Sequence, residues 1–252
     1  MTKAAKREQE RIRELSLEKR REKAEAHARE QKRWPEMAAD EVIAWAQRTN
    51  AWVHVDGAFG LWALTSVEYA LLAKGFRRAN SWATDAHKWL NVPYDSGIAI
   101  VLDPEALGRA MSISGSYLPT SDYRDAMKFT PDSSRRARAL EIWSALKFLG
   151  RAGLSDLVGR TCRCARKIAE SMKRDGIEVL NEIVLNQVVA AFGDNERTKR
   201  VIASIQASGA CWCGGTVWKG RAAMRISVSS WATTDRDIER SITAILEAHR
   251  AS

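Results

Sequence analysis

The sequence lacks any run of about 18 apolar residues, which is the length that a membrane-spanning helix needs. It also lacks the apolar segment that would follow the basic start of a secretory signal. Cysteine is scarce, and Cys162, Cys164, Cys211 and Cys213 form two Cys-x-Cys pairs. This pattern without a sign of export argues against a disulfide framework, and zinc sites usually leave about two to four residues between paired cysteines. We therefore expect a cytoplasmic protein with reduced thiols and no metal site.

Glycine is absent from residues 1–44, and residues 1–33 are rich in charge. These 33 residues carry twelve Lys or Arg against seven Asp or Glu, so over half of the net charge of +9 lies there. They offer no continuous apolar stripe, and Trp34-Pro35 interrupts the pattern. A solvated helix, a disordered tail and a nucleic-acid-binding arm are all compatible with this composition. We favour the first two for residues 1–36, which makes nucleic acid an unlikely partner.

Beyond the tail, strands alternate with helices. A chain of 252 residues with 45% hydrophobic residues can bury one large core or two modest ones. Periodicity and cap residues predict the following elements as far as residue 112: a helix over Met37–Gln47, a strand over Ala51–Asp56, a helix over Ser66–Ala73, strands over Ser81–Thr84 and Gly97–Leu102, and a helix opened by Asp103-Pro104-Glu105. Such alternation is typical of an α/β layer, in which sites gather at strand ends.

The second half of the sequence predicts long helices and a small, largely antiparallel sheet. The expected elements are helices over Arg135–Leu149, Leu154–Lys173 and Glu196–Ala207, strands over Ile177–Leu180, Gln187–Phe192, Thr216–Lys219 and Ala222–Val228, a turn at Gly214-Gly215, and a last helix from Thr233-Thr234-Asp235 to about His249. We therefore expect a large α/β domain over residues 37–139 and a small α+β domain over residues 140–252.

Two segments suggest a site that binds pyridoxal phosphate. Asp56 closes an apolar strand, and Lys88 lies 32 residues later between His87 and Trp89. A lysine that forms a Schiff base must lose its proton, which desolvation beside aromatic residues favours. A carboxylate against the pyridine nitrogen keeps that ring protonated, and the small residues Gly57 and Ala58 leave room for a flat ring. Either residue alone is weak evidence, because a lone Asp after a strand is often a cap and a lone Lys is usually on the surface.

Together, the segments His-Val-Asp-Gly-Ala-Phe-Gly and Asp-Ala-His-Lys-Trp-Leu-Asn closely resemble the group II pyridoxal-phosphate-dependent amino-acid decarboxylases, which include the aromatic-amino-acid and glutamate decarboxylases. The resemblance runs from about Trp45 to the C-terminus. It implies that Lys88 binds the cofactor covalently, that Asp56 faces the pyridine nitrogen, that Ala58 packs on the ring and that His87 is an active-site neighbour. It also implies the C-terminal half of a fold-type I PLP-dependent transferase-like large domain, followed by a small C-terminal domain.

A long polar segment over Ser112–Ser134 contains Pro119 and Pro131, and it exceeds what a compact domain usually leaves unstructured. The resembled family carries, on a flexible loop, a tyrosine that helps to protonate the carbon from which carbon dioxide leaves. Tyr117 in Ser116-Tyr117-Leu118 is similar to that residue, which makes it the candidate acid. Without the resemblance, an ordinary loop tyrosine would be the preferred interpretation.

The sequence departs from the family before Trp45. The resemblance implies further strands and helices there, a Gly/Ser loop for the phosphate and a histidine that stacks on the ring, but residues 1–44 contain no glycine and only His27. Asp85 also stands where many relatives have a neutral residue. We therefore expect decarboxylation of an amino acid, left incomplete because the phosphate-binding half is missing. A homodimer or a complementary N-terminal half are the expected partners. The alternative is a non-catalytic remnant that at most binds a full-length relative or partner chain.

Overall fold

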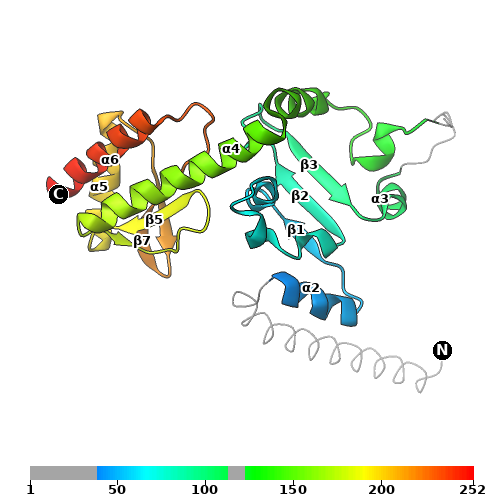
Figure 1. Cartoon of the computed structure of the whole chain (residues 1–252), viewed down its shortest axis with the longest axis horizontal. Helices are drawn as coiled ribbons and strands as arrows, with labels where there is room; N and C mark the ends of the chain where they lie inside the picture. Colours follow the sequence, from blue (N-terminus) through cyan, green and yellow to red (C-terminus); the bar gives the residue numbers. More distant parts are fainter. Residues whose placement is uncertain (1–38, 113–122) are drawn as a thin grey trace, which may run out of the picture. The chain divides into compact units, whose positions relative to one another are not determined.

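The computed structural model describes residues 39–112 and 123–252 (Figure 1). The predicted tail over residues 1–36 and the candidate acid Tyr117 lie outside the described residues. The chain divides into two compact units, one that runs to Val53 and includes Gly75–Arg78, and one made of His54–Lys74 and Ala79–Ser252. The domain boundary expected at residues 139 and 140 stays a prediction.

The smaller unit contains helix α2 (Ala39–Arg48) and the short 3-10 helix η4 (Phe76–Arg78). Helix α2 agrees closely with the helix predicted over residues 37–47. The Asp40 carboxylate lies 2.7 Å from the Arg78 guanidinium, which joins the start of α2 to η4. Gly75 adopts a φ of 90°, a left-handed conformation that favours glycine, at the turn just before η4.

The first sheet of the larger unit has three strands in the order β1-β2-β3 (Figure 1). Strand β1 (His54–Asp56) is parallel to β2 (Ser81–Asp85), and β3 (Gly97–Val101) is antiparallel to β2. Asp56 lies opposite Ala83, so the carboxyl ends of β1 and β2 are at the same end of the sheet. This arrangement brings the two predicted site segments to one end of the sheet.

The connection between β1 and β2 differs from the expected helix over Ser66–Ala73. Before η4, it contains the 3-10 helices η2 (Gly60–Thr65) and η3 (Ala70–Ala73). The apolar side chains of this connection pack with the turn after β2 and with the long helix α4 (Arg138–Arg174). The buried members of this cluster are Trp62, Ala63, Tyr69, Ala86, Trp89, Leu90, Val92, Ile142, Leu154, Val158 and Cys162. Tertiary packing therefore overrides the regular helix that local spacing favoured.

The two helices predicted over residues 135–149 and 154–173 are present as the two parts of α4, one on each side of Gly150. Gly150 interrupts its helical backbone with φ 59° and ψ −171°. The predicted break at Gly150 is therefore present as a kink, whereas Gly153 lies within the helix. After the kink, Leu154, Val158 and Cys162 pack in the cluster that contains Trp89, whereas Cys164, Ala165 and Ile168 pack in a second buried cluster. The apolar stripe of the sequence does not reveal this change of partner.

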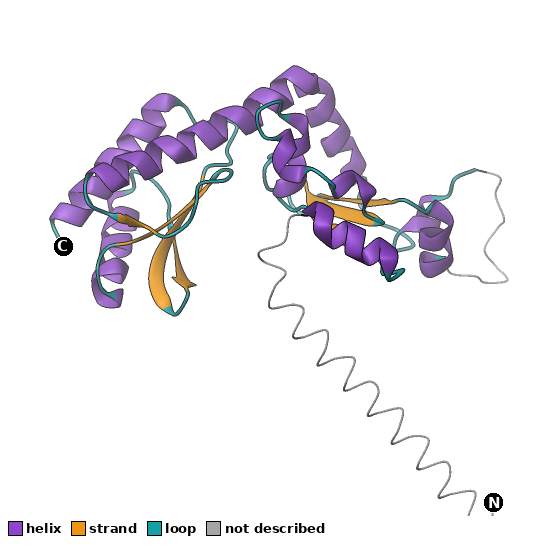
Figure 2. Ribbon diagram, turned by 60° about the horizontal axis from the view of Figure 1, so that its bottom comes forward, coloured by secondary structure: helices purple, strands orange, loops and turns teal. Residues whose placement is uncertain are grey.

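The second sheet contains β4 (Glu178–Val179), β5 (Gln187–Ala191), β6 (Gly214–Trp218) and β7 (Arg221–Ser227), in the antiparallel order β4-β5-β7-β6. Helices α4, α5 (Asn195–Ser208) and α6 (Asp235–Arg250) lie along one side of it (Figure 2). The predicted turn at Gly214-Gly215 is wrong, because both residues pair with β7. The chain turns instead at Lys219 and Gly220, which both have positive φ.

Local chemistry explains two helix starts. The Asp103 carboxylate accepts hydrogen bonds from the backbone N–H groups of Glu105 and Ala106 at the start of α3 (Pro104–Met111). Thr234 and Asp237 form a reciprocal capping box at the start of α6. The loop beyond α3 includes a further 3-10 helix, η5 (Ala126–Phe129).

All four cysteine thiols are free, and Cys162, Cys164 and Cys213 are buried. Among residues 39–112 and 123–252, no cluster of three or more His, Cys, Asp or Glu side chains is arranged to hold a metal ion. In the same residues, no helix combines the length and the apolar character that crossing a membrane requires.

Candidate functional site

Asp56 and Lys88 follow the carboxyl ends of two adjacent parallel strands. Asp56 is the last residue of β1, and Lys88 lies in the turn that begins after Asp85, the last residue of β2. The Lys88 backbone N–H donates a hydrogen bond to the Asp85 carbonyl at 3.2 Å, which closes this turn. The strand pattern of the sequence thus predicts correctly that both residues lie at the carboxyl ends of strands in the same sheet.

The Lys88 amine is partly exposed, and a carboxylate and an aromatic ring lie near it. Its Nζ lies 2.6 Å from Oδ2 of Asp85 and 5.7 Å from the centroid of the Phe59 ring. The side chains of Lys88 and Asp85 are 37% and 35% exposed, so water still reaches both. Sequence reasoning identified neither contact, although the three-residue spacing from Asp85 to Lys88 was a usable signal.

Trp89 anchors the turn in the protein interior. Its side chain is only 1% exposed, and its indole Nε1–H donates a hydrogen bond to Thr161 Oγ1 of α4 at 3.0 Å. The Phe59 ring is near both Trp89 and the Lys88 amine, with its centroid 5.8 Å from that of Trp89 and 5.7 Å from Nζ. Phe59 is therefore the aromatic ring near the Lys88 amine, while Trp89 fixes the backbone that carries Lys88.

Asn91 holds the other end of the turn. It adopts a φ of 58°, which asparagine tolerates better than most residues. Its side-chain amide donates hydrogen bonds to the carbonyls of Trp89 and Ser229, and its side-chain oxygen accepts one from the Trp231 N–H. Residues far along the chain therefore help to fix the Lys88 turn.

His87 has a defined ring orientation. Its Nδ1 lies 2.9 Å from the Ser96 carbonyl oxygen, which can only accept, so Nδ1 carries the proton and donates. The His87 ring stacks on Tyr94 with centroids 4.3 Å apart. In the neutral ring this tautomer leaves a lone pair on Nε2.

Asp56 presents an exposed carboxylate, and its Oδ1 accepts a hydrogen bond from the Ala58 N–H at 3.3 Å. Gly57 is buried, and its N–H donates to the Ala83 carbonyl at 2.8 Å. A Cβ at Gly57 would lie 2.5 Å from Cβ of Leu61. The turn itself therefore requires glycine, independently of the room for a flat ring that the sequence suggested.

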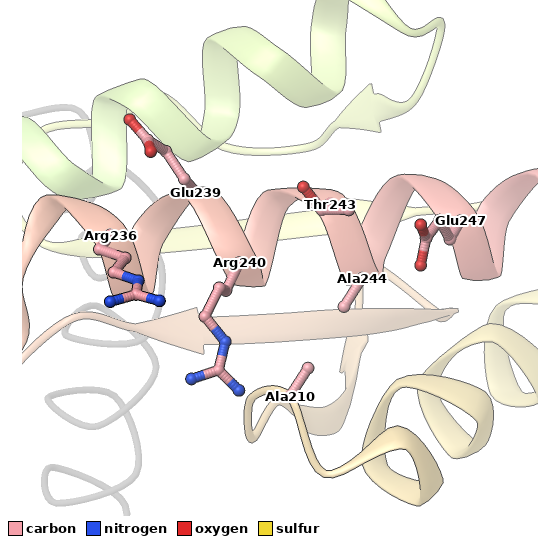
Figure 3. A pocket seen from close by; sticks show the side chains of 7 residues that line it. All are labelled: Ala210, Arg236, Glu239, Arg240, Thr243, Ala244 and Glu247. Carbon is pink, nitrogen blue, oxygen red and sulfur yellow. The ribbon is translucent and has the colours of Figure 1, made fainter.

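A pocket of about 360 Å³ lies elsewhere, over helix α6 (Figure 3). Arg236 and Arg240 extend from α6 on the side of Ala210, and none of Asp56, Ala58, His87 and Lys88 lines the pocket. The remaining lining residues are Glu239, Thr243, Ala244 and Glu247. The pocket is thus separate from the residues at the β1–β2 edge.

Comparisons with known proteins agree with the fold and with the resemblance. The sequence matches the pyridoxal-dependent decarboxylase conserved domain over residues 38–192. It is 29% identical over 211 residues to an aromatic-L-amino-acid decarboxylase of Drosophila lebanonensis, covering 80% of this chain and 51% of that protein. It is 31% identical over 194 residues to a histidine decarboxylase of Drosophila melanogaster, covering 75% of this chain and 23% of the relative. The chain thus spans about half, or less, of the length of these relatives.

Solved structures share the fold. An Oryza sativa TDC with PLP and tryptamine matches 85% of this chain and 47% of its own, with a TM-score of 0.79 and 21% identity. A Catharanthus roseus tryptophan decarboxylase in complex with L-tryptophan gives a TM-score of 0.76 and 22% identity over the same shares. The predicted α/β fold is therefore confirmed. The chain belongs to the pyridoxal-dependent decarboxylase family, whose cofactor is pyridoxal phosphate.

Proposed function

We propose that this chain carries the lysine-bearing part of a pyridoxal-phosphate-dependent amino-acid decarboxylase and acts in the cytoplasm. Lys88 is the proposed attachment residue, and Asp56 the proposed partner of the pyridine nitrogen. The observation that carries the proposal is the placement of an exposed carboxylate and an accessible amine at the same ends of β1 and β2. That donor set fits pyridoxal phosphate, which needs an amine for its aldehyde and an anion for its ring nitrogen.

The cofactor, when bound, supplies the electron-accepting ring that lets the carboxylate of an amino acid leave as carbon dioxide. Lys88, Asp56 and Ala58 each have a proposed role beside the cofactor. Lys88 would hold the aldehyde carbon, and Asp56 would keep a proton on the ring nitrogen. Ala58, whose N–H already orients the Asp56 carboxylate, is the small residue beside the ring.

His87 and Tyr117 are the proposed residues for proton handling. The Ser96 carbonyl fixes the His87 ring with Nδ1 as donor, so Nε2 is left to contact cofactor or substrate. Tyr117 lies outside the described residues, and its proposed task is to deliver a proton to Cα after carbon dioxide leaves. The substrate class is an α-amino acid, as in the family.

Covalent labelling tests this proposal without measuring turnover. The purified chain is mixed with pyridoxal 5'-phosphate, the visible absorption is recorded, and borohydride fixes the adduct for peptide mass spectrometry. We expect the label on Lys88 and its loss in Lys88→Ala, because that amine follows β2 at the same end of the sheet as Asp56. Lys147→Ala, which removes an exposed amine from α4, is the matched control and should keep the label.

Asp56→Ala should retain covalent labelling with reduced cofactor retention during dialysis, because the ring nitrogen loses its anionic partner. Asp125→Ala removes an acidic side chain outside the β1–β2 edge and serves as its control. A folded wild-type chain with neither visible absorption nor a label on Lys88 would exclude the assignment.

A second candidate is a non-catalytic subunit that binds a full-length relative or partner chain. The chain aligns with 51% of the Drosophila lebanonensis relative and 47% of the Oryza sativa structure, so turnover by these residues alone is what distinguishes the two candidates. Under the first proposal, a second copy or a complementary N-terminal half would complete the site. Carbon dioxide release from L-amino acids by the chain alone would dismiss the non-catalytic candidate, whereas cofactor binding without release would favour it.

A further inference from the structure

The Lys88 amine is held by a carboxylate from its own turn. Its Nζ lies 2.6 Å from Asp85 Oδ2, which is the distance of a strong charge-assisted contact. In the described part of the chain, Asp85 is the one carboxylate that forms an ion pair with this amine. An ammonium group has no lone pair with which to attack an aldehyde, so the nitrogen must first lose a proton.

Both members of the pair stand on fixed backbone. Asp85 ends β2, where it pairs with Gly97 of β3. Lys88 is bracketed by the fully buried Ala86 and by Trp89, whose indole is hydrogen-bonded to Thr161. The pair is therefore better preorganised than a contact between two long side chains on a mobile surface, although its atoms remain reachable by water.

We propose that Asp85 is a positioning residue that restrains the Lys88 amine, so that the amine must leave Asp85 before it can bind the aldehyde of a cofactor. This inference rests on the proposed function, because it assigns a control to the same lysine. Asp85 acts through Lys88 and needs no contact with the cofactor.

The chemical step forms a C=N bond and releases one proton and one molecule of water. As the Asp85–Lys88 contact opens, the ammonium releases one proton to solvent, and Nζ attacks the aldehyde carbon. A C=N bond forms, the C=O bond breaks, and the oxygen leaves as water. Borohydride then delivers a hydride that reduces the C=N bond to a stable secondary amine, which records how much Lys88 has reacted.

The test measures the rate of borohydride-trapped label on Lys88 in the wild-type chain and in Asp85→Asn. Pyridoxal 5'-phosphate and pyridoxal are used separately at neutral pH and low salt. Because exposed ion pairs contribute about 0.2–1 kcal/mol, we expect Asp85→Asn to react about 1.4- to fivefold faster with both aldehydes. A change confined to pyridoxal 5'-phosphate would overturn the inference, since Asp85 would then act on the phosphate charge.

Two variants separate restraint of the amine from general effects. Asp85→Glu keeps a carboxylate and should stay close to the wild-type rate. Asp95→Asn removes one negative charge from the same segment, where Asp95 pairs with Arg138 and not with Lys88, and it should also leave the rate unchanged. Added salt should accelerate the wild-type chain and not Asp85→Asn, because ions screen the pair.

The outcomes distinguish this inference from the function beneath it. Equal or slower labelling in Asp85→Asn than in the wild type would overturn the restraint and leave Lys88 as the attachment residue. Absence of label on Lys88 in both proteins, with circular dichroism showing both folded, would overturn the attachment and the restraint together. Faster labelling in Asp85→Asn alone among the three Asp variants supports the restraint.

Discussion

The two sheets of the larger unit bury their apolar side chains to different extents. The sheet of β4–β7 has helices α4, α5 and α6 along one side, and its cluster includes fully buried Val188, Phe192, Ile205 and Met224. The cluster beside the sheet of β1–β3 has fewer buried members, and exposed apolar side chains near it include Val67 at 95%, Leu71 at 80% and Leu102 at 66%. Val217 of β6 is also 72% exposed. The residues proposed for chemistry thus lie beside the sheet with the smaller buried cluster. The larger buried cluster lies beside the sheet of β4–β7, which contains none of them.

The largest expected effect tests the densely packed part. Phe192→Ala should lower the free energy of unfolding by about 3–5 kcal/mol, because it leaves a cavity beside α5 and α6. The Phe192 side chain is 1% exposed. Urea unfolding followed by circular dichroism measures the loss. Phe148→Ala removes the same ring from a position that is 90% exposed and should change stability by less than about 0.5 kcal/mol. Similar losses in the two variants would contradict the comparison.

The turn after β1 gives the next prediction. Gly57→Ala should cost about 1–3 kcal/mol, because the added Cβ meets Leu61 and the backbone must shift. The same shift would displace Asp56, so cofactor retention should fall as well. Gly60→Ala is the matched control, since a Cβ there meets no atom within 4 Å. If Gly57→Ala is as stable as Gly60→Ala, the packing of this turn has been misassigned.

The contact that anchors the Lys88 turn is tested at Thr161. Thr161→Val preserves the shape but leaves the buried Trp89 Nε1–H without an acceptor, which should cost about 1–3 kcal/mol. Thr161→Ser retains the hydroxyl and should lose much less of this stability. Thermal unfolding compares the two variants, and a larger loss in Thr161→Ser would show that the methyl group matters more than the hydrogen bond.

The smallest effect is a pH dependence in the densely packed part. Burial, followed by the positive charge of Arg197, lowers the pKa of His249 below its usual 6.5. Because the unfolded chain then binds a proton more readily, His249 makes stability fall as the pH drops from about 7 through its lowered pKa. Melting temperatures between pH 5 and 8 should fall less on acidification in His249→Gln. Parallel curves would remove this explanation.

Much of the site's location could be predicted from the sequence. The apolar strand ending at Asp56 and the second strand before Asp85 place Asp56 and Lys88 at one sheet edge, as the structure has them. Helix caps were equally accessible, because Asp103-Pro104 and Thr234 act on backbone groups within three residues. These features depend on local chemistry, which a sequence displays directly.

Other features depend on partners that are distant in the sequence. Trp89 meets Thr161, 72 residues later, so its position in the interior could not be read from its neighbours. Gly214 and Gly215 resemble a turn, yet pairing with Met224 and Arg225 makes them a strand. The Asp85–Lys88 contact could have been predicted from the sequence, since only two residues lie between the two charged side chains.

Helix α4 supplies buried side chains to both apolar clusters, Ile142 and Val158 to one and Ala165 and Ile168 to the other. Cleavage of α4 between residues 154 and 174 would therefore separate side chains that pack together in these clusters. The shortest autonomous piece that contains Lys88 should extend at least to Arg174, and limited digestion should spare residues 154–174 until the whole unit melts.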